Sequence, residues 1–258
     1  MAPRGKVEDR MIMLKTGLAV ALLIAAAAPP ASAGEVVPDE DIRVLLTFGG
    51  HGFEREPFFR MFDNLPGVAV TPAEMPAAAS RLKPGLEAEF DVIVMYDMVN
   101  SISEKERAAF VNLLESGIGL VSLHHNLGAH RDWPEFTDII GGRYLFAPET
   151  LEGREYPPST YAHGQDMDIE VVDRDHPVTA GISNFRIHDE AYGGFFVSRD
   201  ARVLLTTDHP GCGREIAWTT SFGNSRVTYI LLGHDSAAWN HPAYPRLLVN
   251  AIRWAARR

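Results

Sequence analysis

The sequence predicts an α/β fold in which helices flank a parallel sheet. Three runs of strand length, residues 43–48, 91–96 and 119–124, are rich in Val, Ile and Leu with few polar interruptions. Strands that are covered on both faces have this nearly continuous apolar pattern, whereas half-exposed strands alternate. A helical segment lies between the second and third runs, and this strand–helix–strand order is typical of a right-handed parallel crossover.

The helix between those two strands has clear boundaries. Ser103 and Glu106 form a capping box at its start, and Gly117 is placed to end it. A second helix is expected to close the chain, with Pro245 at its start and an apolar stripe along one face. That stripe consists of Leu247, Leu248, Ala251, Ile252 and Ala255.

The rest of the chain from residue 34 is expected to belong to the same domain. Residues 143–158 are rich in turn formers and are expected to form an excursion over the sheet. Repeats, low-complexity linkers and breaks in composition are absent from the sequence, which favours a single domain over residues 34–258. Further strands are expected at residues 167–172, 184–187, 202–206 and 226–232.

Residues 1–33 have the pattern of a secretory signal peptide with a short upstream extension. A basic start near Lys15 precedes an apolar run over residues 17–28, and Ala31-Ser32-Ala33 follows as a cleavage motif. The apolar run is too short to favour a stable membrane span, although an uncleaved anchor is the alternative. We therefore expect cleavage after Ala33, a periplasmic or secreted protein, and no stable membrane anchor after cleavage.

Charge and cysteine content exclude several classes of protein. Cleavage after Ala33 would remove four of the 24 basic and two of the 34 acidic residues, leaving a net charge of −12. A chain this acidic, without a basic cluster, is not expected to bind nucleic acid. The single cysteine, Cys212, cannot form an intrachain disulfide, and its glycine-flanked position is typical of an incidental loop residue.

Polar residues follow several of the expected strands. Ligands of open parallel sheets bind beyond the carboxyl ends of the strands. A single histidine at such an end is usually structural, but four ends that each carry a histidine, a carboxylate or both predict a shared site. The four ends are Gly49-Gly50-His51-Gly52, Tyr96-Asp97, His124-His125-Asn126 and Gly233-His234-Asp235.

Two of these ends leave alternatives open. In extended backbone His124 and His125 would point to opposite faces, so both reach one pocket only if the chain turns sharply there. The Gly-rich segment around Gly50 and His51 is either an anion-binding loop or a simple tight turn.

Another histidine and two carboxylates occur at His188-Asp189-Glu190. This segment suits acid–base chemistry if one carboxylate is desolvated, and is otherwise a solvated loop. Aromatic residues near the motifs are either sugar-stacking platforms or ordinary core residues. They are Trp133, Tyr144, Tyr192 and Trp239.

Taken together, many segments of the chain resemble the ThuA-like family, in the same order and over nearly the whole mature chain. The matching segments are Leu45-Leu46-Thr47-Phe48-Gly49-Gly50-His51, residues 91–97, residues 119–125, Asp132-Trp133-Pro134-Glu135-Phe136, residues 141–144, residues 176–182, Asp189-Glu190-Ala191-Tyr192, residues 231–235 and residues 250–254.

This resemblance implies a flavodoxin-like, three-layer fold similar to that of class I glutamine amidotransferases. Those enzymes place a catalytic cysteine on the turn after the third strand, where this sequence has His124 and His125. Cys212 lies in another segment. Without a thiolate at the turn there is no acyl-enzyme route to glutamine hydrolysis, so glutaminase activity is excluded.

The resemblance also implies a role in disaccharide utilisation, such as cleavage of a 3-keto-glycoside made by an upstream sugar dehydrogenase. On this hypothesis His124 or His234 is the base, and Glu190 or Asp235 positions it or protonates the leaving oxygen. No cofactor is specified by the sequence, but a divalent metal held by His51, His124 and Glu190 could polarise the ketone. The residues expected to bind the sugar are Gly50, His51, Asp97, His125, Trp133, Tyr192 and Trp239.

A non-catalytic role remains the alternative to an enzyme. The same pocket could belong to a sugar-binding or accessory protein, or the chain could be a structural component of an assembly. Fold resemblance alone does not decide between these.

Overall fold

The computed structural model describes residues 40–258, which belong to one compact unit. The expected signal peptide, its cleavage site and the domain boundary at residue 34 lie outside these residues. Within them, no helix is long and apolar enough to cross a membrane.

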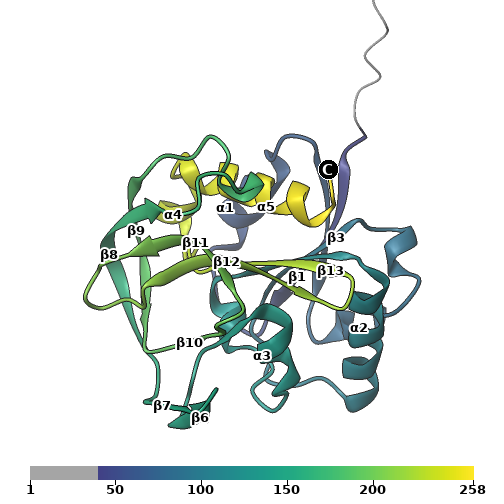
Figure 1. Ribbon diagram of the computed structural model, residues 1–258. Coiled ribbons are helices and arrows are strands. Elements are labelled where there is room, and N and C mark those ends of the chain that lie inside the picture. Colours follow the sequence, from purple (N-terminus) through teal and green to yellow (C-terminus); the bar gives the residue numbers. More distant parts are fainter. Residues whose placement is uncertain (1–39) are drawn as a thin grey trace, which may run out of the picture. The chain divides into compact units, whose positions relative to one another are not determined.

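A nine-stranded mixed sheet forms the centre of the molecule (Figure 1). Its strand order is β2-β1-β3-β4-β13-β12-β11-β8-β9. The large strands are β1 (Ile42–Gly49), β2 (Val68–Glu74), β3 (Val92–Asp97), β4 (Gly119–Leu123), β8 (Thr160–Val171), β9 (Phe185–Gly193), β11 (Arg202–Thr207), β12 (Glu215–Phe222) and β13 (Ser225–Ile230). Short strands form two small sheets, β5 (Gly142–Arg143) with β10 (Phe196–Val197), and β6 (Glu149–Leu151) with β7 (Arg154–Tyr156).

Helices cover both faces of this sheet, which gives the three layers expected from the sequence (Figure 1). One face carries α1 (Arg55–Asp63), α4 (Ser236–Trp239) and α5 (Ala243–Ala255), and the other carries α2 (Glu104–Ser116) and α3 (Glu135–Ile140). Short 3₁₀ helices are η1 (Ala77–Arg81), η2 (Leu86–Ala88), η3 (His124–Gly128) and η4 (Pro177–Thr179).

The sheet is parallel in only one half. Strands β2, β1, β3, β4 and β13 run parallel, whereas the pairings from β13 through β12, β11 and β8 to β9 are all antiparallel. The expectation of parallel strands is therefore right for the first half and wrong for the second. The reason is that hairpin-connected strands can also be apolar when helices cover them.

The predicted capping box of α2 is present. The Ser103 hydroxyl accepts from the Glu106 backbone N–H, the Glu106 carboxylate accepts from the Ser103 backbone N–H, and Gly117 ends the helix with φ +99. Buried side chains of α2 and α5 pack in the same core as β3 and β4. Strand β4, in contrast, ends at Leu123, one residue earlier than expected.

Three differences concern the segments that follow. Strand β8 begins at Thr160, seven residues before the expected start, and β9 continues to Gly193. As a result His188-Asp189-Glu190 lies within a strand and is not a solvated loop. The excursion over residues 143–158 contains the small β6–β7 hairpin.

Candidate functional site

A cavity of about 350 Å³ lies beyond the carboxyl ends of β1, β3, β4 and β13. This is the edge at which the sequence predicted a site. Strands β8 and β9 close the cavity from the antiparallel half. The lining residues are His51, Gly52, Met98, His125, Gly128, Tyr144, Phe146, Tyr161, His163, Glu190, Tyr192 and His234.

A sharp turn at His124 settles how two consecutive histidines are directed. His124 has φ +47 and starts η3 immediately after β4, so the strand alternation does not continue. The His124 ring is fully buried beneath the cavity, and its Nδ1 lies 2.6 Å from the Leu231 carbonyl oxygen. Because a carbonyl oxygen can only accept, Nδ1 is the nitrogen that carries the proton. The Nε2 atom of His124 is thereby directed at the other side chains of the site.

Three polar atoms surround that Nε2 atom. Glu190 Oε2 lies 3.0 Å away, His234 Nδ1 lies 3.1 Å away and the Tyr192 hydroxyl lies 3.0 Å away. His234 Nδ1 and Glu190 Oε2 are themselves 3.2 Å apart. His124, Glu190 and His234 thus form a compact triangle of potential ligand atoms, which we call the His–Glu–His cluster.

Glu190 lies close to His234 although their strands, β9 and β13, are not neighbours in the sheet. Strand β9 is the edge strand, four positions from β13 in the strand order. In a flat sheet four positions correspond to about 19 Å. The 3.2 Å separation of the His234 and Glu190 atoms therefore requires the antiparallel half to bend over the parallel strand ends.

Charge in the cluster is concentrated on Glu190. Burial raises the pKa of Glu190, but the neighbouring His124 and His234 imidazoles outweigh it, and the net pKa is well below the usual value. The hydrogen bond with Glu190 raises the pKa of His234 against the opposing effect of its own burial. Glu190 is consequently a carboxylate at neutral pH, and it favours positive charge beside it.

Asp189, the neighbour of Glu190, fixes the backbone that carries His234. Its carboxylate accepts from the backbone N–H groups of Gly233 at 2.7 Å, His234 at 3.0 Å and Glu190 at 2.8 Å. Gly233 has φ +115, and a Cβ there would lie 2.3 Å from the Tyr244 hydroxyl oxygen. Only glycine fits this turn, which sets the position of the following histidine.

His163 is a further histidine of the site that the sequence did not indicate. Its Nδ1 lies 2.9 Å from Glu190 Oε1, the carboxylate oxygen that faces away from the cluster. A β-bulge between Ala162 and Gln165 interrupts the pairing of β8 with β9, and Gly164 has φ +64. Bulges of this kind redirect side chains next to functional sites. A period-two pattern cannot show such a bulge in advance.

Of three other residues expected at the site, His51 and His125 line the cavity and Gly50 does not. The His51 ring stacks on the His125 ring at 4.6 Å, outside the His–Glu–His cluster. His125 Nε2 bonds the Tyr96 carbonyl oxygen at 2.8 Å, and burial lowers the pKa of His125 well below its usual value. Gly50 forms the tight turn that precedes His51. The position requires glycine, because φ is +75 and a Cβ would lie 2.5 Å from the Met98 carbonyl oxygen.

Besides His124 and Gly50, four expected site residues do not line the cavity. Asp97 is buried and accepts from the Thr47 hydroxyl at 2.5 Å, and Asp235 caps α4 by accepting from the Ala237 backbone N–H. Trp133 packs against Phe110, His130 and Phe136. Trp239 packs against Phe58 and Tyr96, and its indole N–H donates to the Gly233 carbonyl at 2.9 Å.

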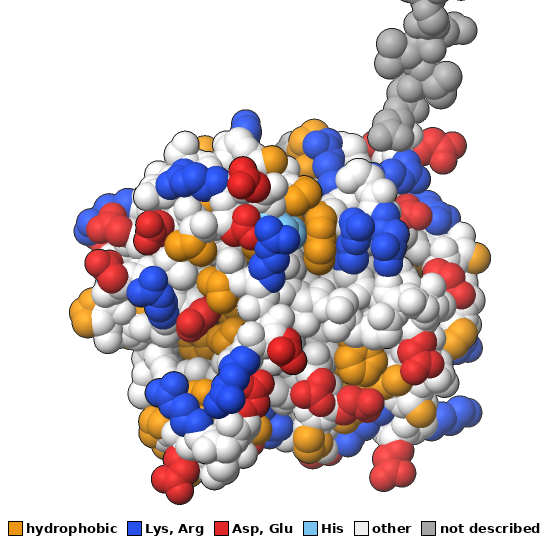
Figure 2. Space-filling view, viewed as in Figure 1, with side chains coloured by type: hydrophobic (Ala, Val, Ile, Leu, Met, Phe, Trp, Pro, Cys, Tyr) orange, Lys and Arg blue, Asp and Glu red, His pale blue; other side chains and the backbone are white. Residues whose placement is uncertain are grey.

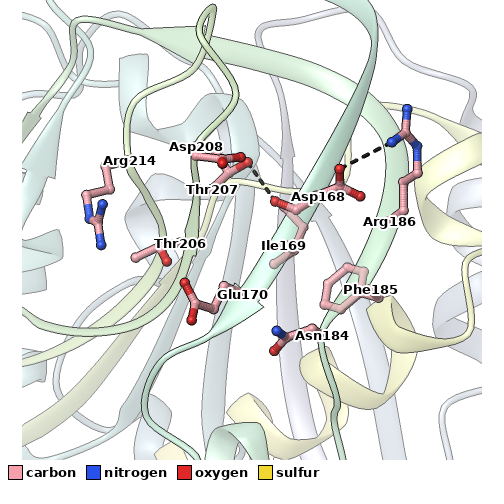
Figure 3. Close-up of a pocket in the computed structure, with 10 residues that line it drawn as sticks. All are labelled: Asp168, Ile169, Glu170, Asn184, Phe185, Arg186, Thr206, Thr207, Asp208 and Arg214. Carbon is pink, nitrogen blue, oxygen red and sulfur yellow. Dashed lines mark hydrogen bonds and ion pairs between the residues drawn. The ribbon is translucent and has the colours of Figure 1, made fainter.

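A larger cavity, of about 480 Å³, lies between β8, β9 and β11 (Figure 3). Asp168 pairs with Arg186 at 3.2 Å, and the other charged side chains there are Glu170, Asp208 and Arg214. This cavity has no histidine among its lining residues. We therefore place the chemistry in the smaller, histidine-lined cavity.

Acidic and basic side chains are interspersed over the face of the molecule in Figure 2.

Cys212 does not offer a nucleophile. Burial raises the pKa of its thiol to about 11, so the thiol is protonated at neutral pH.

The comparison with family models identifies one family. The family model for ThuA, described as trehalose utilisation, matches residues 56–255. No curated protein sequence matches the chain significantly.

Solved structures show the same fold. A protein named as ThuA-like from Parabacteroides merdae superposes with a TM-score of 0.68 at 21% identity, covering 84% of this chain and 90% of the other. A second, from Bacteroides uniformis, has a TM-score of 0.64 at 22% identity, with 87% and 95% covered. A β-galactosidase from Rahnella sp. R3 has a TM-score of 0.53 at 13% identity, and 83% of this chain matches 31% of that chain.

These structural likenesses establish the three-layer α/β fold, and the family model extends over most of the chain. The chain therefore belongs to the ThuA, or trehalose utilisation, family.

Proposed function

We propose that this protein is an exported enzyme of disaccharide utilisation that cleaves an oxidised sugar, a 3-keto-glycoside, in the histidine-lined cavity. The observation that carries the proposal is the convergence of His124 Nε2, Glu190 Oε2 and His234 Nδ1 at the inner side of that cavity. The family's link to trehalose utilisation supports the choice of a sugar. The signal-like pattern of residues 1–33 supports export to the periplasm or the medium.

The chemistry suits a ketone-activated elimination. A ketone at C3 acidifies the neighbouring C2–H, so a base removes that proton while the C1–O bond breaks and a C1=C2 bond forms. The leaving oxygen takes up a proton, and water later adds to the double bond. This route avoids the oxocarbenium-like transition state of ordinary glycosidases. It needs a proton acceptor, a proton donor and a group that stabilises charge on the keto oxygen.

The polar groups of the cavity match those needs. Glu190 and His234 line the cavity, whereas His124 is fully buried behind them. Asp235 caps α4, and among the described residues none of its hydrogen bonds reaches the cluster. We therefore assign the chemistry to the His–Glu–His cluster, with Asp235 in a structural role.

Aromatic side chains support a sugar as the ligand. Only three large apolar side chains are exposed among residues 40–258: Phe146, Tyr161 and Val172. Phe146 and Tyr161 line the cavity, together with the half-buried Tyr144. Exposed aromatic faces of this kind give a sugar ring an apolar surface to stack on, with a polar tip for hydrogen bonds.

The test is an assay of the purified protein with a 3-keto-disaccharide and with the unoxidised disaccharide. We expect monosaccharide release from the oxidised sugar alone, and loss of that activity in His124→Ala. His188→Ala is the matched control, since His188 is an exposed histidine paired with Asp166 outside the cavity. No turnover of any keto-sugar, with or without divalent metals, would contradict the proposal. Tight calorimetric binding of sugars without turnover would identify a binding or accessory protein instead.

A further inference from the structure

We infer that the His–Glu–His cluster is a divalent-metal site that accepts Zn²⁺ or a similar ion. The inference deepens the proposed function, because a metal here would polarise the keto oxygen of the substrate, but its evidence is geometric and does not depend on the substrate. Imidazole nitrogens and a carboxylate oxygen are the donors of catalytic zinc sites with two histidines and one glutamate.

Hydrogen bonds alone leave one contact of the cluster unfavourable. His124 Nδ1 uses its proton on the Leu231 carbonyl, so in the neutral ring Nε2 presents a lone pair, to which the Tyr192 hydroxyl can donate at 3.0 Å. Glu190 Oε2, which is also an acceptor, still faces that nitrogen at 3.0 Å. If Nε2 is protonated instead, a buried imidazolium results, and a protonated His234 Nδ1 at 3.1 Å would be a second donor facing it. A cation shared by the three atoms removes both conflicts.

The size of the triangle fits a tetrahedral ion. The three atom pairs are 3.0, 3.1 and 3.2 Å apart. Ligand atoms at about 2.0–2.1 Å from a tetrahedral zinc ion are about 3.3 Å from one another. The cluster is therefore nearly assembled for a metal without movement of the backbone.

The surroundings of the triangle are those of a metal site. Metal-binding histidines usually donate their second ring N–H to a carbonyl or carboxylate, as His124 Nδ1 does to Leu231. The second oxygen of Glu190 is held by His163 Nδ1 at 2.9 Å, and Asp189 fixes the backbone of His234. Each ligand is thus oriented by a partner outside the cluster.

A coordination position remains for substrate. Glu190 and His234 border the cavity, so an ion between them would face its interior. Three protein ligands and one open position are typical of catalytic zinc sites. A keto oxygen in that position would be polarised by the ion, which is the stabilisation of charge on the keto oxygen that the proposed elimination needs.

The experiment measures metal binding directly. Elemental analysis of the purified protein, and calorimetric titration of the EDTA-stripped protein with Zn²⁺ and Mn²⁺, should give one ion per chain. The stripped protein loaded with Co²⁺ should show the visible absorption of a tetrahedral ion. Glu190→Gln and His234→Ala should each lose the ion and the absorption, while His188→Ala keeps both.

The outcomes separate this inference from the proposed function. Melting temperatures of the stripped variants establish that they are folded. Folded wild-type protein that binds neither ion, or ion binding that persists in Glu190→Gln and His234→Ala, overturns the metal site. Ion binding at this cluster without turnover of any keto-glycoside supports the metal site and overturns the proposed function. Turnover of a keto-glycoside by protein that binds no metal supports the proposed function and overturns the metal site.

Discussion

The two halves of the sheet contribute to the cavity in different ways. The parallel half supplies side chains from the ends of its strands: His51 after β1, His125 after β4 and His234 after β13. The antiparallel half supplies side chains from within its strands, namely His163 from β8 and Glu190 from β9. A search for polar residues at the carboxyl ends of parallel strands therefore finds only part of a site when the sheet is mixed.

The halves also differ in how they hold those residues. In the parallel half, tight turns such as those at Gly50 and Gly233 set the positions, and both turns leave no room for a Cβ. In the antiparallel half, a bulge at Gly164 directs His163, and the buried Asp189 carboxylate accepts from the Glu190 backbone N–H. Substitutions in the two halves should therefore change turnover, KM and stability in different ways.

The largest expected effect concerns the acid of the antiparallel half. Glu190→Gln keeps the size of the side chain but removes the charge that faces His124 and His234. We expect kcat on a keto-glycoside to fall about 10²–10⁴-fold, the range for loss of an acid–base group. Steady-state kinetics would measure it, with circular dichroism to confirm the fold. Near-normal turnover would mean that the antiparallel half only shapes the cavity.

In the parallel half, the titration of Asp97 is expected to make stability depend on pH. Burial raises the pKa of Asp97 to about 6, against the lowering effect of its hydrogen bond with Thr47. A folded-state pKa above the unfolded one stabilises the protein at low pH, and this contribution is lost as the pH rises through about 6. Asp97→Asn lacks that titration. Its stability relative to wild type should increase by about 2 kcal/mol between pH 4 and pH 7.5.

Urea unfolding of both proteins at the two pH values provides the measurement. His130 Nε2 lies 4.0 Å from Asp97 Oδ2, and burial lowers the pKa of His130 to about 4. The same measurements on His130→Gln, with and without Asp97→Asn, therefore separate the two titrations. A difference that does not change with pH would show that Asp97 titrates normally, and that the strand end is less dry than its burial indicates.

A smaller effect is expected at the bulge. Gly164 has φ +64, and a Cβ there would be 3.5 Å from His188 Nε2, so Gly164→Ala adds conformational cost without a clash. We expect a loss of about 1 kcal/mol of stability and reduced turnover, because the bulge directs His163 to Glu190. Gly153→Ala on the β6–β7 hairpin, with φ +75 and no neighbour within 4 Å, is the matched control. Equal turnover in both variants would contradict a functional bulge.

The smallest effect is expected at the rim. Tyr161 is 63% exposed on β8, so Tyr161→Ala should leave the melting temperature unchanged. Loss of one stacking contact, about 0.5–1.5 kcal/mol, should raise KM for a keto-glycoside about 2- to 10-fold. Val172→Ala, which removes another exposed apolar side chain away from the cavity, is the control. An unchanged KM would exclude Tyr161 from sugar binding.

Much of the fold could be predicted because its signals are local. Strands β1, β3 and β4 are continuous apolar runs, and the Ser103–Glu106 capping box with Gly117 defines α2. Strands β2 and β12 were not expected, since their patterns are weak. The edge strand β2 contains Pro72 and is mostly exposed, and β12 carries Thr219, Thr220 and Ser221. Their strand conformation depends on the neighbours with which they pair.

The site could be predicted where histidines or carboxylates directly follow an expected strand. His124, Glu190 and His234 were candidates from the sequence, and the structure brings them together. Trp133 and Trp239 were expected at the sugar and are core residues instead, since an aromatic side chain has the same sequence pattern in either place. His163 had no sequence signal, because its direction depends on an unpaired residue in the β8–β9 ladder.

The family, the crossover with its capped helix and the histidines that follow the parallel strands could all be derived from the order of the amino acids. Tertiary structure alone decided that Glu190, on an edge strand and 66 positions from His124, lies 3.0 Å from its ring. Local periodicity specifies which face of a strand is buried, but it contains no information on how far a sheet bends. That bending results from the packing of the whole domain, and it completes the cluster.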